Sequence, residues 1–253
     1  ITTGGAMSFG NSVTTTGTGT TISLTANAGG ISLSRNIQAA NNAQISLTAT
    51  GSSITRTGGT VGATGSTSLL VLSAGGSIGA SGAAVATNVG TIRASAGGNI
   101  YLTEANAVQL GDGTGPVTTT SGVVNITAAG NLSTGTWGGG DIISTTGGVG
   151  TITLTTTAGG TMALSDSLSS VEGGSITLTN GGVLTVSAPI SARGGFTQNG
   201  AGGVTLGANI TTTGDPVSFL RAVTLTAGCT IDSTNGGSNP TGGNITFQST
   251  LSG

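Results

Sequence analysis

Residues 22–34 read ISLTANAGGISLS, in which an alternation of apolar and polar residues meets two glycines and then begins again. A period of two is typical of a β-strand that buries one face. Gly29 and Gly30 separate the two alternations. Glycine suits a sharp bend there because it adopts positive φ without steric cost. The stretch therefore predicts two strands joined by a tight corner.

The four-residue pattern ISLT recurs along the chain, and its third position is apolar in every copy but one, which has Gln198. The mean separation of the copies, (245 − 22)/9, is about 25 residues, a period typical of solenoids. We expect the first and third positions to point inward, so that Ile152 and Leu154 are buried and Thr153 and Thr155 are exposed. The copies begin at Ile22, Ile45, Leu70, Ile92, Val124, Ile152, Ile176, Phe196, Val223 and Ile245.

A unit of about 25 residues has room for three short strands and three turns, and such units stack with equivalent strands paired in parallel. We therefore expect an all-β fold: a single-domain parallel β-helix, or β-solenoid, of about ten coils with three strands per coil. It should run continuously over residues 1–253, with no clear internal boundary and its longest inserted coils around 100–151. An antiparallel sandwich or barrel also fits regularly spaced strands, but the long period and the scarcity of Asn-Gly hairpin turns favour the solenoid.

Four stretches of the C-terminal third carry a resemblance to a known family. They are GGFTQ at 194–198, ANITTTGDPVSF at 208–219, VTLTAGCTID at 223–232 and GGNITFQSTLSG at 242–253. They resemble the repeat regions of giant bacterial surface proteins, the filamentous-haemagglutinin-like, β-strand-repeat adhesins. The resemblance implies a right-handed parallel β-helix, secretion, and a role in adhesion or in an extracellular matrix.

The composition excludes several classes of chemistry. The 253 residues contain no histidine, and all five basic residues are arginine. A Ser-His-Asp triad, a histidine metal site and a lysine-containing phosphate loop are therefore impossible. The few scattered arginines form no basic stripe for nucleic acid, and no apolar run is long enough for a transmembrane helix.

The acidic residues are scattered along the sequence, and none stands within three residues of another. Enzymes that act on polysaccharides need clustered carboxylates to move protons or bind metal. We therefore expect no enzymatic activity, no catalytic or metal-binding residue and no cofactor. Asp215 and Asp232 could lie on adjacent coils, but their expected role is in turns. The seven acids are Glu104, Asp112, Asp141, Asp166, Glu172, Asp215 and Asp232.

Two features are candidates for binding. Trp137 lies within the longest inserted coil and could face a ligand, although packing over a corner is the simpler interpretation. Near the C-terminus, Ile245, Thr246, Phe247 and Gln248 form a strand whose unpaired N–H and C=O groups could provide an edge for end-to-end assembly.

A regular core without a chemical constellation favours a structural or adhesive β-solenoid that is extracellular or at the cell surface. It would be a filament or fibre subunit, or a segment of a giant surface adhesin. Its expected partners are itself, head to tail, or further coils of a longer chain, with surface glycans as possible ligands. The alternative is a carbohydrate-binding or carbohydrate-active β-helix protein.

Overall fold

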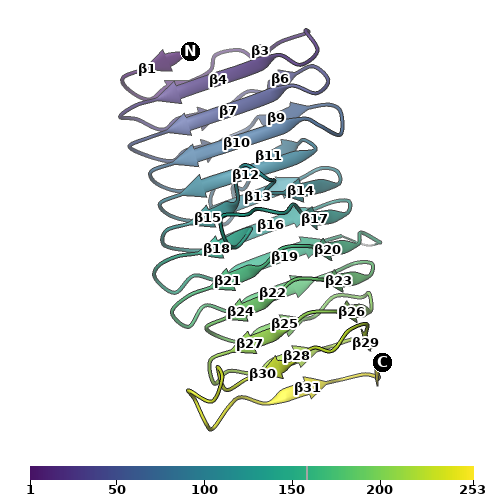
Figure 1. Ribbon diagram of the computed structural model, residues 1–253. Coiled ribbons are helices and arrows are strands. Elements are labelled where there is room, and N and C mark those ends of the chain that lie inside the picture. Colours follow the sequence, from purple (N-terminus) through teal and green to yellow (C-terminus); the bar gives the residue numbers. More distant parts are fainter. Residues whose placement is uncertain (158) are drawn as a thin grey trace.

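The computed structural model describes residues 1–157 and 159–253 and shows a rod of stacked β-coils with the termini at opposite ends (Figure 1). The rod has about 10 turns, about 23 residues apart, whose strands pair in parallel. No helix occurs in the part of the chain that is described. The prediction of an all-β parallel solenoid is confirmed.

Two sets of strands form the walls of the rod. We call the 18-stranded sheet sheet A; the 11-stranded and three-stranded sheets, which bridges at Ile78 connect, are together sheet B. The strands of sheet A are β1 (Thr2–Thr3), β4 (Thr21–Ala26), β7 (Gln44–Ala49), β10 (Leu69–Ala74), β12 (Thr91–Ala96), β14 (Val108–Leu110), β15 (Val117–Thr119), β17 (Leu132–Thr134), β18 (Ile143–Thr145), β20 (Met162–Leu164), β21 (Leu168–Ser170), β23 (Leu184–Val186), β24 (Ile190–Ala192), β26 (Val204–Leu206), β27 (Ile210–Thr212), β29 (Val223–Leu225), β30 (Ile231–Asp232) and β32 (Leu251–Ser252). The strands of sheet B are β2 (Met7–Ser8), β3 (Val13–Thr14), β5 (Ile31–Leu33), β6 (Ile37–Ala39), β8 (Ile54–Arg56), β9 (Thr60–Ala63), β11 (Val85–Asn88), β13 (Ile100–Glu104), β16 (Val124–Ala128), β19 (Ile152–Thr156), β22 (Ile176–Thr179), β25 (Phe196–Gln198), β28 (Val217–Phe219) and β31 (Ile245–Phe247).

One column of apolar side chains runs through sheet B along the whole rod. All members except the last, Ile245, are buried. A slip of one residue in any coil would turn its inward side chains toward solvent, so this column fixes the register of the coils. Its members, each paired with the next, are Met7, Ile31, Ile54, Ile78, Ile100, Val124, Ile152, Ile176, Phe196, Val217 and Ile245.

The predicted alternation holds in the first eight copies of the motif, where both the first and the third positions are buried. It weakens in the last two copies, because Leu225 and Phe247 are only half-buried and Ile245 is 42% exposed. Thr153 and Thr155 point outward as predicted, but they are half-buried rather than exposed. Outward side chains of the neighbouring coils flank them, as Thr177 flanks Thr153.

The longest strand of each coil changes sheet part-way along the rod. In the first coils it belongs to sheet A, where β4, β7, β10 and β12 have six residues each. The next coil splits this strand, because β12 pairs with both β14 and β15. On sheet B the reverse occurs: β13 pairs with both Ile78 and β11 and becomes the long strand. Before residue 78 each coil has two short strands in sheet B, and after residue 117 each coil has two short strands in sheet A. The corner between the two short strands therefore changes sheet. We call residues 78–117, where this change occurs, the coil transition.

The corner glycines have a different role from the predicted one. Gly29 and Gly30 do not adopt positive φ. A Cβ atom on Gly29 would lie 2.2 Å from the backbone nitrogen of Ala6, and one on Gly30 would lie 2.6 Å from the carbonyl oxygen of Ser53. Glycine is required at this corner because adjacent coils approach too closely for any side chain.

From β15 onward, one strand of sheet A in most coils ends on an inward-pointing residue with a buried hydroxyl group. The hydroxyl of Ser170 donates to the carbonyl of Gly174 (2.6 Å), and that of Ser233 donates to the carbonyl of Gly243 (2.8 Å). These bonds give the buried hydroxyl groups partners at the corners of the coils. The column, interrupted by Ala192, contains Thr119, Thr145, Ser170, Thr212 and Ser233.

Candidate functional site

Two short turns leave the regular coil at the coil transition. Residues 79–84 form one, closed by a bridge between Ala80 and Ala83, and residues 111–116 form the other, closed by a bridge between Asp112 and Gly115. The first begins at Gly79, whose φ is +69° and where a Cβ would lie 2.5 Å from the carbonyl oxygen of Tyr101. The rod is therefore irregular here, because these two turns interrupt the regular succession of strands and corners.

A groove of about 490 Å³ lies beside the turn at 79–84. It crosses β8, β11, β13 and β16, so it extends along the rod over neighbouring coils. Its polar groups include the guanidinium of Arg56, the phenol of Tyr101 and the amide of Asn125. None of the described residues that line it is acidic. The lining residues are Arg56, Ala80, Ser81, Gly82, Ala84, Ala86, Tyr101, Thr103 and Asn125.

Arg56 and Tyr101 reach this groove from β8 and β13. Arg56 takes the position that Leu33 occupies in the preceding coil, and its Nε donates to the carbonyl of Gly59 at 2.8 Å. Tyr101 lies between the buried Ile100 and Leu102 of β13, so its ring must point outward. Tyr101 is the chain's only tyrosine, but the sequence alone favoured Trp137 as the ligand-facing aromatic.

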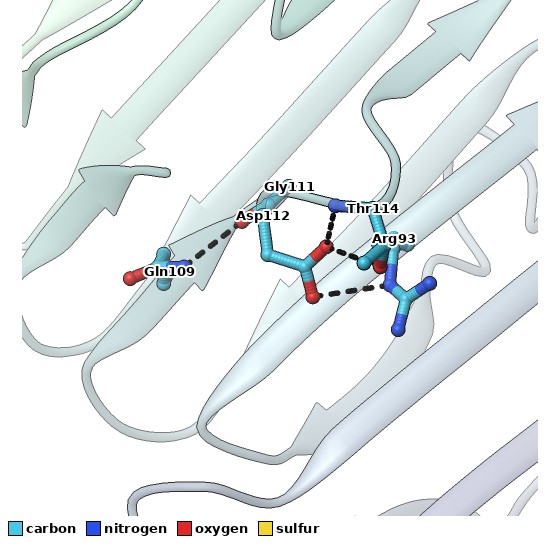
Figure 2. Close-up of polar contacts among 5 residues, drawn as sticks. All are labelled: Arg93, Gln109, Gly111, Asp112 and Thr114. Atoms are coloured by element: carbon cyan, nitrogen blue, oxygen red, sulfur yellow. Dashed lines mark hydrogen bonds and ion pairs between the residues drawn. The ribbon is translucent and has the colours of Figure 1, made fainter. Parts of the chain in front are cut away.

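The second turn is held by the carboxylate of Asp112 (Figure 2). One oxygen accepts bonds from the N–H and hydroxyl of Thr114, both at 2.8 Å, and the other lies 3.2 Å from Nε of Arg93. The side-chain amide of Gln109 donates to the carbonyl of Gly111 at 3.0 Å. Because both oxygens of Asp112 are occupied, its role here is to fix the turn against β12.

Glu104 carries an inward-pointing carboxyl group that was not predicted to lie in the core. It follows Ile100 and Leu102 in the alternation of β13 and is fully buried. The backbone N–H groups of Val89 and Asn106 each donate to it at 3.2 Å. Burial nevertheless raises the pKa of Glu104, because these hydrogen bonds only partly offset the loss of hydration. The alternation alone could have located this residue.

We expect the stability of the protein to depend on pH through Glu104. With its pKa raised, the folded protein binds more protons than the unfolded chain at pH values between the ordinary and the raised pKa. The free energy of unfolding should therefore fall as pH rises through this window. Glu104→Gln should increase stability at pH 8 and flatten the pH dependence in urea unfolding between pH 4 and pH 8. An unchanged slope in the variant would contradict this role.

Trp137, the candidate ligand-facing aromatic, is not among the residues that line the groove. It is half-buried and packs against the hydrophobic core. Its backbone N–H donates to a carboxylate oxygen of Asp166 at 2.5 Å, and a Cβ on Gly139 would lie 2.6 Å from its ring. These contacts are those of an aromatic packed over a corner.

Several of the remaining acids hold local structure. The two oxygens of Asp141 accept from the hydroxyls of Ser167 and Ser169, both at 2.6 Å. Asp232 accepts from the hydroxyl and N–H of Thr234 and from the N–H of Gly236, and these bonds lower its pKa. Within residues 1–157 and 159–253, no three His, Cys, Asp or Glu side chains come together as a potential metal site.

The predicted assembly edge lies in the last strand of sheet B. β31 pairs on one side with β28. The backbone N–H of Gln248, the residue that follows β31, donates to the carbonyl of Phe219 at 2.9 Å. The ring of Phe247 stacks on that of Phe219, with centroids 5.2 Å apart, and Phe219 in turn contacts the tilted ring of Phe196. Ile245 and Thr246 are exposed.

No family model, curated protein or solved structure matches this chain. None of the described residues belongs to a helix that is long and apolar enough to cross a membrane.

Proposed function

We propose that this chain is a structural or adhesive β-solenoid of an extracellular fibre or surface adhesin, whose terminal coil is covered by another coil of the same kind. The observation that carries the proposal is the apolar column of sheet B, which runs through all the coils and ends on the exposed Ile245. A stack that keeps one register from end to end is suited to a mechanical role, because each coil contacts only its neighbours.

The free edge of β31 has a defined pattern of donors. Val217 donates its N–H to the carbonyl of Asn244, and Gln248 donates to Phe219, both at 2.9 Å. In a parallel ladder the N–H and C=O of one residue point to the same side, and successive residues alternate. The N–H groups of Ile245 and Phe247 therefore point away from β28 and are available to a further coil.

Strand β2 of a second copy fits this edge. Met7 is the first member of the apolar column and Ile245 the last, and MSF at residues 7–9 alternates as ITF at residues 245–247 does. In the preceding coils the column residue donates to the residue before its partner, as Ile152 donates to Ser175 and Phe196 to Pro216, both at 2.9 Å. By the same rule, Ile245 would donate to the carbonyl of Ala6 in the second copy.

Disulfide trapping tests this register. In a Cys229→Ser background, Ser8→Cys with Thr246→Cys should oxidise to a ladder of covalent oligomers. The two residues would be on adjacent strands, about 4.8 Å apart and within disulfide reach. A matched control, Ser8→Cys with Ser252→Cys, should remain monomeric because these residues would be out of register. Equal cross-linking of both pairs, or of neither, would contradict the proposed contact.

Proline at Ile245 should weaken the same contact. Ile245→Pro removes an outward N–H while leaving the bonds between β28 and β31 in place. We expect sedimentation velocity to show a shift from oligomers to monomers with little change in the unfolding midpoint. Ile245→Leu keeps both the N–H and an apolar side chain and should assemble like the parent. Undiminished assembly of the proline variant would argue against β31 as the edge.

Carbohydrate binding is a second candidate function. It is favoured by the groove at the coil transition, where an outward tyrosine, an arginine and an amide line one hollow surface. Most other outward positions of sheet B after the transition carry Thr, Ser or Asn, so the groove is chemically different from the rest of this face.

A further inference from the structure

We propose that the groove at the coil transition binds a saccharide that contains uronic acid, with Tyr101 beneath a sugar ring and Arg56 on its carboxylate. The inference rests on the second candidate function and gives it a ligand class. It is independent of end-to-end assembly, because the groove lies within the rod rather than at its ends.

Tyr101 supplies the surface for the sugar ring. It stands beside Asn125 on the adjacent strand, and Ala84 and Ala86 line the same groove. Short alanine side chains do not reach over a neighbouring ring, so the phenol can present its face and its hydroxyl together. Aromatic side chains of this kind offer an apolar body with a polar tip, which suits the apolar face and the hydroxyl groups of a pyranose.

Arg56 supplies the preference for an acid. Its Nε is held by Gly59, which orients the guanidinium and leaves the two terminal nitrogens for a ligand. Across the described residues the only ion pair joins Arg93 to Asp112, so Arg56 has no carboxylate partner there. A planar guanidinium can bind a carboxylate through two parallel hydrogen bonds.

The groove is long enough for more than one sugar ring. Its lining residues belong to β8, β11, β13 and β16 on successive coils, and neighbouring strands are about 4.8 Å apart. Thr103 and Asn125 lie along it and can bond to hydroxyl groups. An oligosaccharide lying along the rod therefore matches its shape better than a compact small molecule does.

Isothermal titration with oligomers of galacturonic, glucuronic and mannuronic acid, and with neutral glucose oligomers, tests the proposal. We expect at least one acidic oligomer to bind more tightly than the neutral ones. Tyr101→Ala should weaken that binding about tenfold, as for the loss of an anchoring aromatic. Arg56→Gln should reduce the preference for the acidic over the neutral oligomer.

Two further variants separate a binding role from a structural one. Trp137→Phe changes the chain's only tryptophan, which does not line the groove, and should leave binding unchanged. Ala86→Leu should fill the groove without removing Tyr101 or Arg56 and should also weaken binding, with circular dichroism confirming an intact fold. Absence of binding by every acidic oligomer, or equal binding by the parent and Tyr101→Ala, would overturn the proposal.

Discussion

Replacing Ile152 with Asp should lower the free energy of unfolding by about 4 kcal/mol or more. Ile152 is completely buried in the middle of the apolar column, between Val124 and Ile176. A carboxylate there would be surrounded by aliphatic side chains and would lose its hydration without gaining a partner. The defect would also propagate, because each coil is supported by the coils above and below it. Urea unfolding followed by circular dichroism measures the loss.

Thr153→Asp is the matched control for this effect. Thr153 is the next residue of the same strand, but its side chain points outward and is flanked by Asn125 and Thr177 of the neighbouring coils. Its replacement should change stability by about 0.5 kcal/mol at most, as expected for a surface position. Comparable destabilisation by the two substitutions would contradict the assigned register.

Gly202→Ala should destabilise the rod by about 3 kcal/mol, the second-largest effect expected. A Cβ on Gly202 would lie 1.7 Å from the carbonyl oxygen of Gly182 in the preceding coil. That contact cannot be relieved by rotating a side chain, because the atom belongs to the backbone. Gly182 is itself bonded through its N–H to the carbonyl of Gly160 at 2.6 Å, so a shift would disturb a third coil.

Gly228→Ala provides the comparison for the glycine prediction. Gly228 is exposed, its φ is not positive, and nothing lies within 4 Å of the position that its Cβ would take. Alanine should be neutral or slightly stabilising there, because it restricts the unfolded chain. Thermal unfolding of the two variants side by side would distinguish close approach between coils from a general need for glycine.

The alternation of apolar and polar residues was sufficient to predict the coils. The pleat of a strand forces successive side chains to opposite faces, so Ile152 and Thr153 could be assigned to opposite faces from sequence alone. The reason for the corner glycines could not be read in the same way. At Gly29 it depends on the distance to Ala6 in another coil, which no local pattern reveals.

The coil transition and its groove were not predictable from the period. The alternations at Ile92 and Ile100 look alike in sequence, yet one belongs to sheet A and the other to sheet B. Which alternation forms the longer strand depends on how the corners stack. Arg56 and Tyr101 line one groove because of that stacking, whereas the sequence alone favoured Trp137, which packs against the core.

Hydrogen-bond scalar couplings between backbone nitrogen and carbonyl carbon test the central claim most directly, namely that one parallel register continues through every coil. In deuterated, isotope-labelled protein, the nitrogen of Ile152 should couple to the carbonyl carbon of Ser175, and that of Ile100 to Val123 across the coil transition. Couplings from successive inward and outward residues should alternate between the following and the preceding coil, as Ile100 to Val123 and Tyr101 to Ile78, and each should join residues about one turn, or about 23 positions, apart. Couplings that instead join neighbouring strands in antiparallel order, as in a sandwich of hairpins, would contradict the account.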